Sequence, residues 1–524
     1  MTPDTPIVEI RDGKVQGLVN DRGVLVFRNI PYGASTAGSG RFMPPRPPQP
    51  WTGIRDAAVE GPKSPQASPV FGREALRDVM EPVLRLDQPM SEDCLHVNVF
   101  TPGLQGADTQ VARRPVMVWL HGGGFASTCS EVAWYDGSNL CRRGDVVVVT
   151  LNHRLNVFGY LHLGDILDER FAHSGNNGIA DIAQALAWVR DNIAAFGGDP
   201  GNVTIFGESG GGAKVTTLMA YPAAKGLFHK AVVMSGPLMR AMSRNGATAL
   251  ARKVLEGLAV GADAAALQQA PIEAILAASQ AALAIGLAPS EGTPFVPTAT
   301  ASGGFTPVVD GSSLPAHPFD VSSPPSSADV PLMIGITRDE VQYWTHHDPK
   351  IWDDTLTLAE LEARVRPFAG ARTDAVLAAY AETALSPAKQ WVAIQTDRGA
   401  RAASIGMIER RITDGAAPSY FYIFDWESPT LGGRFRAGHG VDIPFIMDNV
   451  EVGSSVVGDQ AASADLCAKA YSGALLAFAR TGNPSTAQAP WPAYDLKDRA
   501  TMRFNTQSAV VDDPDAVRRA LWIL

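Results

Sequence analysis

The chain has 524 residues, a net charge of −10, and 45% hydrophobic against 19% charged residues, an ordinary composition for a soluble globular enzyme. This acidic balance gives no electrostatic basis for binding nucleic acid or an anionic membrane surface. No run reaches the apolar length of a membrane span, and no signal peptide is visible at the N-terminus. The four cysteines form neither a disulfide framework nor a C-x-x-C pair, so we expect a cytoplasmic protein.

The first 50 residues predict antiparallel and extended structure. Residues 7–30 alternate apolar runs with Asp-Gly and Asp-Arg-Gly turns, a pattern typical of one or two hairpins. Residues 43–51 are rich in proline, which excludes a helix and the interior of a sheet. For this segment we favour packing on the surface over a role as an SH3-type ligand.

From residue 95 onward, strand and helix patterns alternate. Residues 95–100 alternate apolar and polar side chains, as a half-exposed strand does, and residues 181–196 have the apolar spacing of an amphipathic helix that ends at Gly197-Gly198. Other apolar runs predict strands at 115–120, 146–151, 203–206, 231–234, 332–336 and 420–424. This order indicates an α/β fold with a mostly parallel central sheet and helices on both faces.

Two regions interrupt the alternation, at 240–330 and 355–415. The first is helical over 240–285 and continues as a connector rich in Pro, Ser and Gly. In the second, Thr357 and Glu360 fit a capping box, and Ser386-Pro387 fits a helix N-cap followed by proline. We interpret both as helical insertions over the active-site edge of a single domain, 1–524.

The most informative motif is Gly207-Glu208-Ser209-Gly210-Gly211. It lies between the strand predicted at 203–206 and a helix predicted from residue 212, which is the context of a nucleophile elbow. Glycine supplies the small side chains that such a sharp turn needs. Ser209 would lie exposed at a helix N-terminus, where backbone N–H groups favour a developing oxyanion.

A second glycine cluster, Gly122-Gly123-Gly124, follows the strand predicted at 115–120. Consecutive glycines let backbone N–H groups face a cavity without obstruction by side chains, which is what an oxyanion hole requires. Together with the elbow, this cluster predicts acyl-transfer chemistry.

A general base and an acid are expected after Ser209 in the chain. Of the histidines that follow, His439 lies in a glycine-flanked loop, where an imidazole can be exposed; the others are His317, His346 and His347. For His346-His347-Asp348 we favour a solvated turn over a metal site. The acid candidates are the neighbours Asp339 and Glu340, just after the strand at 332–336, and Asp310, whose Asp-Gly context reads first as a turn.

Several longer motifs carry a resemblance that covers nearly the whole chain. They are residues 27–33, 41–42, 91–99, 135–140, 152–160, 196–209 and 491–494. The most specific is Phe196-Gly-Gly-Asp-Pro-Gly-Asn-Val-Thr-Ile-Phe-Gly-Glu-Ser209. The sequence resembles the type-B carboxylesterases of the α/β-hydrolase fold, a group that includes bacterial para-nitrobenzyl esterases and the cholinesterases.

The resemblance implies ester hydrolysis through an acyl-enzyme. Ser209 would be the nucleophile, His439 the base, and Glu340 rather than Asp339 the acid. The amides of Gly123, Gly124 and Gly210 would form the oxyanion hole. The chain departs from the family at Gly210, where alanine is usual. It also departs at Cys94, which secreted relatives pair with an upstream cysteine that is absent here, so we expect a free, buried thiol.

The substrate is expected to be an uncharged, partly apolar ester. Aromatic side chains near the motifs are candidates for the pocket wall: Phe125, Trp134, Tyr135, Trp344 and Phe421. Arg434 and Arg436, close to His439, are evidence against this preference. The same triad would also serve an amidase or a carbamate hydrolase, and a non-catalytic scaffold on the same fold is a further alternative.

No cofactor or metal is expected, because the sequence has no metal-ligand cluster, P-loop or dinucleotide-binding loop. The expected partner is a small-molecule ester, with no nucleic acid and no membrane. The sequence carries no signal for an oligomeric state.

Overall fold

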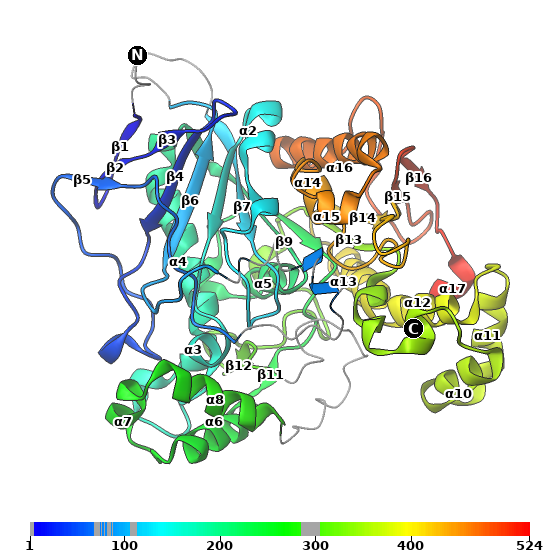
Figure 1. The fold of residues 1–524 in the computed structure, drawn as a ribbon, viewed down its shortest axis with the longest axis horizontal. Helices are drawn as coiled ribbons and strands as arrows, with labels where there is room; N and C mark the ends of the chain where they lie inside the picture. The colour runs from blue at the N-terminus through cyan, green and yellow to red at the C-terminus, as the bar shows by residue number, and fades with distance from the viewer. Residues whose placement is uncertain are drawn as a thin grey trace.

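A computed structural model describes residues 5–67, 74, 76, 77, 79, 80, 85, 87–104, 113–284 and 304–523. A large twisted sheet runs through its middle, and helices cover both of its faces (Figure 1). Within the described ranges, no helix has the length and apolar character needed to cross a membrane.

The central sheet has eleven strands, and its middle is parallel. The strands from one edge to the other are β16 (Ala509–Val511), β15 (Thr501–Phe504), β14 (Ser419–Phe424), β13 (Leu332–Thr337), β10 (Lys230–Met234), β9 (Gly198–Glu208), β7 (Arg114–Leu120), β8 (Val147–Leu151), β6 (His96–Thr101), β4 (Leu25–Pro31) and β3 (Leu18–Val19). Strands β15 to β8 pair in parallel, whereas β16, β6, β4 and β3 pair antiparallel. The prediction of a mostly parallel central sheet is therefore confirmed.

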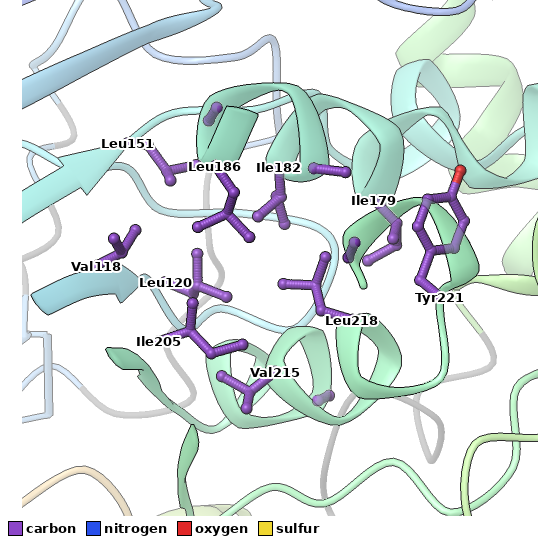
Figure 2. Close-up of a cluster of buried hydrophobic side chains, with 14 of the residues drawn as sticks. Val118, Leu120, Leu151, Ile179, Ile182, Leu186, Ile205, Val215, Leu218 and Tyr221 are labelled. Carbon is purple, nitrogen blue, oxygen red and sulfur yellow. The ribbon is translucent and has the colours of Figure 1, made fainter. Parts of the chain in front are cut away.

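Two hydrophobic cores lie on the two faces of this sheet. Along β7, Val118 and Leu120 face one core, while Met117 and Trp119 face the other, as the two-residue period of a strand requires. The first core lies under α4 (Asn177–Asn192) and α5 (Gly210–Met219), and Figure 2 shows it between these helices and the sheet. The second lies under α2 (Ser138–Gly144) and α16 (Ala461–Thr481).

Strand β6 differs from the sequence prediction. Its alternation predicts a half-exposed strand, but every residue of β6 is buried. The polar positions have partners inside the protein: Asn98 Nδ2 donates to Thr150 Oγ1 at 3.1 Å and to Glu131 Oε1 at 3.2 Å. His96 Nε2 lies 2.8 Å from the carbonyl oxygen of Pro62. A polar side chain with such partners can be buried, so alternation alone does not indicate exposure.

The N-terminal segment, predicted to form one or two hairpins, forms two. One pairs β1 (Ile7–Ile10) with β2 (Gly13–Gln16), and the other pairs β3 with β4. The proline-rich segment at 43–51 contains no helix or strand, as predicted. It is followed by β5 (Ile54–Asp56), which pairs in parallel with β2.

The first interruption contains three helices that extend the first core. They are α6 (Arg244–Leu258), α7 (Ala264–Gln269) and α8 (Ile272–Ala284), at the bottom of Figure 1. Residues 285–303 of the predicted connector lie outside the described residues. The rest of the connector includes β12 (Val308–Val309), which pairs with β11 (Met242–Ser243).

The second interruption builds a small core of its own. Its helices are η8 (Glu340–His347), α9 (Pro349–Trp352), α10 (Leu358–Ala369), α11 (Thr373–Ala381) and α12 (Pro387–Thr396), at the lower right of Figure 1. The capping box of Thr357 with Glu360 and the N-cap at Ser386 are both present. The last helix of the predicted insertion, α13 (Ala402–Thr413), instead packs on β13 and β14, so it belongs to the layer that covers the sheet.

Candidate active site

Ser209 occupies a strained turn between β9 and α5. Its backbone has φ 57° and ψ −122°, a conformation that L-residues rarely adopt. Its amide donates to the carbonyl oxygen of Met234, the last residue of β10, at 2.9 Å. The hydroxyl-bearing residue is half-buried. The turn therefore holds Ser209 at the carboxyl end of the parallel strands.

The glycines of the motif allow the turn to pack directly on β7. A Cβ atom on Gly211 would lie 2.0 Å from the carbonyl oxygen of Leu120, and one on Gly207 would lie 2.6 Å from the same oxygen. Behind the turn, a Cβ atom on Gly236 would lie 2.0 Å from the carbonyl oxygen of Ser209. No larger residue fits at these positions unless the backbone moves.

The carbonyl group of Gly123, in the glycine loop after β7, is held by two amides of the same loop. Gly123 and Gly124 have φ of 77° and 64°, which favour glycine. The carbonyl oxygen of Gly123 accepts from the amides of Ala126 and Ser127, both at 3.1 Å. In a trans peptide unit, the C=O of one residue and the N–H of the next point in opposite directions. The N–H of Gly124 therefore points away from these two donors.

Gly210 lies against this loop. A Cβ atom on Gly210 would lie 2.1 Å from the carbonyl oxygen of Gly124 and 2.4 Å from its Cα atom. Glycine at this position thus has a physical reason, because the start of α5 and the glycine loop are in backbone contact.

Glu340 and His439 form a close buried pair. Nδ1 of His439 lies 2.5 Å from Oε2 of Glu340, and the other oxygen, Oε1, accepts from the amide of Thr337 at 2.9 Å. Glu340 follows β13, and His439 lies in the loop after β14. A hydrogen bond of 2.9 Å from the amide of Asp339 to the carbonyl oxygen of Ala437 joins the two loops.

The two alternative acids lie elsewhere. Asp339 is buried and pairs with Arg338 Nη2 at 2.7 Å and with Arg436 Nη2 at 3.3 Å. Asp310 accepts from its own turn and lies 3.2 Å from His173 Nδ1. The carboxylate that the structure places against His439 Nδ1 is that of Glu340.

The segment His346-His347-Asp348 differs from the predicted solvated turn. Both histidines belong to η8, and His346 is buried, with Nδ1 2.6 Å from the carbonyl oxygen of Tyr343. The two imidazole rings are 3.8 Å apart between centroids. In the part of the chain that the structure describes, no group of three His, Cys, Asp or Glu residues has the arrangement of a metal site.

Glu208 is a member of the site that the sequence analysis missed. Its carboxylate is buried, and Oε1 lies 3.2 Å from Nε2 of His439. Burial raises the pKa of Glu208 to about 7, although the charge of His439 lowers it. The signal in the sequence was its position directly before Ser209, at the end of β9.

The two carboxylates favour the imidazolium form of His439. Burial lowers the pKa of this imidazole, but the charges of Glu208 and Glu340, together with the hydrogen bond that the imidazole donates to Glu340, raise it to about 9. The rise follows the general rule that an opposite charge at contact distance stabilises the charged form of a base.

The structure places Ser209 beside Glu208 and His439, without a hydrogen bond from its hydroxyl to the imidazole. Among the described contacts, none joins Ser209 Oγ to His439, whose Nε2 faces Glu208. A Cβ atom on Gly122 would lie 3.1 Å from Glu208 Oε2 and 3.6 Å from Ser209 Cβ, so these groups line the same side of the glycine loop. Catalytic hydrogen bonds are often long in unliganded sites.

Two of the predicted pocket residues lie near this cluster. The half-buried ring of Trp344 is 4.6 Å from the His439 ring between centroids. Tyr135 is buried against Trp119, and both burial and the charge of Glu208 raise the pKa of its hydroxyl.

The other three predicted pocket residues lie in the cores. Phe125 packs edge-on against Tyr160 at 5.1 Å, and Trp134 is buried in the second core. Phe421 is fully buried within β14, and its described ring contact is with Tyr494 at 6.2 Å. Phe421 and Trp134 are thus placed with the side chains that pack the sheet.

The four cysteines are all buried and unpaired. Burial raises the pKa of the Cys94 thiol to about 12. The prediction of a free, buried thiol at Cys94 is confirmed.

Comparisons with known proteins show the family to which the chain belongs. The model of the carboxylesterase family matches residues 4–522. The chain is 34% identical over 519 residues to the para-nitrobenzyl esterase of Bacillus subtilis, covering 98% of this chain and 97% of that protein. It is 30% identical to the phenmedipham hydrolase of Pseudarthrobacter oxydans, with 97% and 96% covered.

Solved structures give the same result. A carboxylesterase of Geobacillus stearothermophilus superposes with a TM-score of 0.81 at 36% sequence identity, covering 98% of this chain and 99% of that one. A para-nitrobenzyl esterase structure superposes with a TM-score of 0.80 at 32% identity. The chain belongs to the carboxylesterase family and is a carboxylic ester hydrolase of the α/β-hydrolase fold.

Proposed function

We propose that the chain hydrolyses esters through a Ser209–His439–Glu340 triad. The contact between His439 Nδ1 and Glu340 Oε2 at 2.5 Å carries the proposal, because it fixes the tautomer that leaves Nε2 available as a base. The strained backbone of Ser209 supports it, since strain of this kind concentrates at functional sites.

In this mechanism Ser209 Oγ attacks the ester carbonyl carbon while Nε2 of His439 takes its proton. The imidazolium is stabilised by Glu340 and returns the proton to the alcohol, which leaves. Water then attacks the acyl-enzyme by the same route and releases the acid. Before the first step, Nε2 must turn from Glu208 Oε1 toward the serine hydroxyl.

The amides of Gly123, Gly124 and Gly210 are the proposed donors to the oxyanion. The carbonyl groups that precede the first two amides accept hydrogen bonds from donors of the loop, so each N–H points away from the donors of its own peptide unit. The third amide belongs to the first residue of α5, where the helix dipole also favours negative charge. Such donors act because they are oriented before the charge develops.

For the substrate we propose an uncharged ester with an apolar portion. Trp344 offers an aromatic face beside His439, and the buried carboxylate of Glu208 would repel an anion. Arg436, whose charge would favour an anionic substrate, is buried, and its Nη2 atom lies 3.3 Å from Asp339 Oδ1. A neutral diester is expected to have a higher kcat/KM than the corresponding monoester anion; the reverse order would contradict this preference.

We propose a reducing, cytoplasmic setting on the basis of the four buried thiols. Cell fractionation with an antibody to the native protein tests this location.

A burst experiment tests the proposed catalytic route. Rapid mixing with a para-nitrophenyl ester that deacylates slowly should release one equivalent of nitrophenol per chain before the steady state. The Ser209→Ala protein should show no burst, because no acyl-enzyme forms. A burst of the same size in Ser209→Ala would contradict the assignment of the nucleophile.

A further inference from the structure

Lys214 is a buried cation for which the proposed mechanism has no use. It lies on α5, and its side chain has no solvent exposure. Its Nζ atom donates to the carbonyl oxygen of His121 at 2.8 Å and lies 5.9 Å from the centre of the Phe125 ring. Among the described residues no carboxylate pairs with it. Lysine is rarely buried to this extent without a counter-charge, so simple core packing is a poor explanation.

The titratable groups that face Lys214 are two histidines. His121 directly follows β7, and His153 lies just after β8. Their rings stack with centroids 5.0 Å apart. Burial and the charge of Lys214 lower the pKa of both imidazoles, which disfavours a second positive charge beside Lys214, and an imidazole offers no negative charge in either protonation state. Burial also lowers the pKa of Lys214 to about 7. In either charge state its nitrogen keeps N–H groups that can donate.

The bond from Lys214 belongs to a series of three along the glycine loop. The carbonyl oxygen of His121 accepts from Lys214, that of Gly122 from Thr128 Oγ1 at 3.0 Å, and that of Gly123 from loop amides at 3.1 Å. Each bond fixes one peptide plane, and each plane directs the next N–H the opposite way. The donors to Gly122 and Gly123 lie within the loop itself. Lys214 instead reaches from α5, the helix that begins after Ser209.

We propose that Lys214 is a positioning residue that holds the glycine loop at a fixed position relative to α5, the helix that follows Ser209. The inference rests on the proposed role of the Gly123 and Gly124 amides. Without the bond to His121, the loop keeps its internal hydrogen bonds but loses this link to α5, so its amides can shift together relative to Ser209. Their contribution is made to the oxyanion and not to the ester, so kcat should fall while KM changes little.

Three variants test this role. Lys214→Met keeps a long side chain without a donor, Lys214→Gln keeps N–H donors without a charge, and Thr217→Val is the matched control. Thr217 is also fully buried on α5, but its hydroxyl donates to the carbonyl oxygen of Ala213 within the same helix, at 2.7 Å. Each kcat is divided by the fraction of chains titrated at the active serine, which removes the effect of misfolded protein.

A trifluoromethyl ketone supplies the second readout. Ser209 Oγ adds to its carbonyl carbon, the proton passes to His439, and the adduct carries an oxyanion in the hole. For Lys214→Met we expect kcat and the affinity for this inhibitor to fall together by about 10- to 100-fold, with KM within about twofold of the wild-type value. Lys214→Gln should lose less, and Thr217→Val should keep both values.

The outcomes separate the two proposals. Failure of the inhibitor to modify Ser209 in the wild-type protein would contradict the proposed function. Modification of Ser209, with Lys214→Met equal to Thr217→Val in kcat and inhibitor affinity, would overturn the role of Lys214 alone. If Lys214→Met yields no folded protein, Lys214→Gln decides: wild-type inhibitor affinity in that variant together with a lowered kcat would also overturn the role.

Discussion

The two halves of the candidate site are held in place by different forces. The nucleophile half, named for the proposed role of Ser209, consists of Ser209 and the glycine loop, and its parts meet through backbone contacts, such as that of Gly210 with Gly124. The base half, named for the proposed role of His439, consists of His439 and Glu340 on two loops, and it is held by charged side chains. Sterics therefore set the first half and electrostatics the second, so the first should respond to added volume and the second to removed charge and to pH.

The largest effect is expected from removal of the reacting groups. Ser209→Ala and His439→Ala should each lower kcat by about 10⁶-fold, since serine and base act as one unit. Steady-state hydrolysis of a para-nitrophenyl ester measures the loss, and circular dichroism checks that both proteins fold. If His439→Ala retained a tenth of the wild-type rate, another residue would have to be the base.

Loss of the acid should cost less. Glu340→Gln removes the charge that orients and stabilises the imidazolium, and a loss of about 10³- to 10⁴-fold in kcat is expected. The matched variant is Asp339→Asn at the neighbouring position. A wild-type rate in Glu340→Gln, with an inactive Asp339→Asn, would show that the acid is Asp339 and not Glu340.

Added volume should damage the nucleophile half. Gly210→Ala places a methyl group where the carbonyl oxygen of Gly124 lies, and displacement of the glycine loop should lower kcat by about 10- to 100-fold. Gly473→Ala is the control, because a Cβ atom on this α16 residue meets no neighbour within 4 Å. Equal kcat in the two variants would show that the loop tolerates the methyl group.

Removed charge should shift the pH dependence of the base half. The base must be neutral to accept a proton, so kcat/KM should rise with pH, with an apparent pKa above the usual 6.5 of an imidazole. Glu208→Gln removes a carboxylate that stabilises the imidazolium, so the pKa of His439 falls and the acidic limb moves to lower pH, by about one unit or more.

Asp442→Asn is the graded comparison for this shift. Asp442 is buried, and its charge also raises the pKa of His439, but by less than the charges of Glu208 and Glu340 do. Its replacement should move the acidic limb to lower pH by less than Glu208→Gln does. A limb that does not move in Glu208→Gln would show that this carboxylate does not act on the base.

The smallest effect on catalysis is expected at Asp339. Its carboxylate pairs with Arg338 and Arg436 and does not touch His439. Asp339→Asn should leave kcat within a few-fold of the wild-type value but lower the free energy of unfolding by about 1–3 kcal/mol. Urea denaturation measures this difference, and an unchanged midpoint would mean that the two arginine contacts contribute little to stability.

Local patterns made much of the fold predictable. Continuous apolar runs located the buried parallel strands, and the caps at Thr357 and Ser386 were readable because their partners lie three residues away. The burial of β6 could not be predicted from the local sequence, because the partners of Asn98 and His96 lie more than 30 residues away in the chain.

The same limit applies to the site. The glycine motif indicated Ser209, because the residues that define the turn are neighbours in the chain. The approach of Glu208 to His439, the bond from Lys214 to His121 and the placement of Phe421 in the core depend on which strands are neighbours in the sheet. Phe421 also shows why aromatic content alone does not indicate a pocket wall, since every residue of β14 is buried and each face of the strand lies on a core.

Organophosphate labelling tests the central claim most directly, namely that the two halves form one catalytic unit around Ser209. The wild-type protein and His439→Ala are incubated with the reagent, the mass of the intact chain is followed over time, and the adduct is located by peptide mapping. We predict one adduct per chain on Ser209 in the wild-type protein, and labelling slower by several orders of magnitude in His439→Ala. An adduct on another residue, or equal labelling rates in the two proteins, would contradict the account.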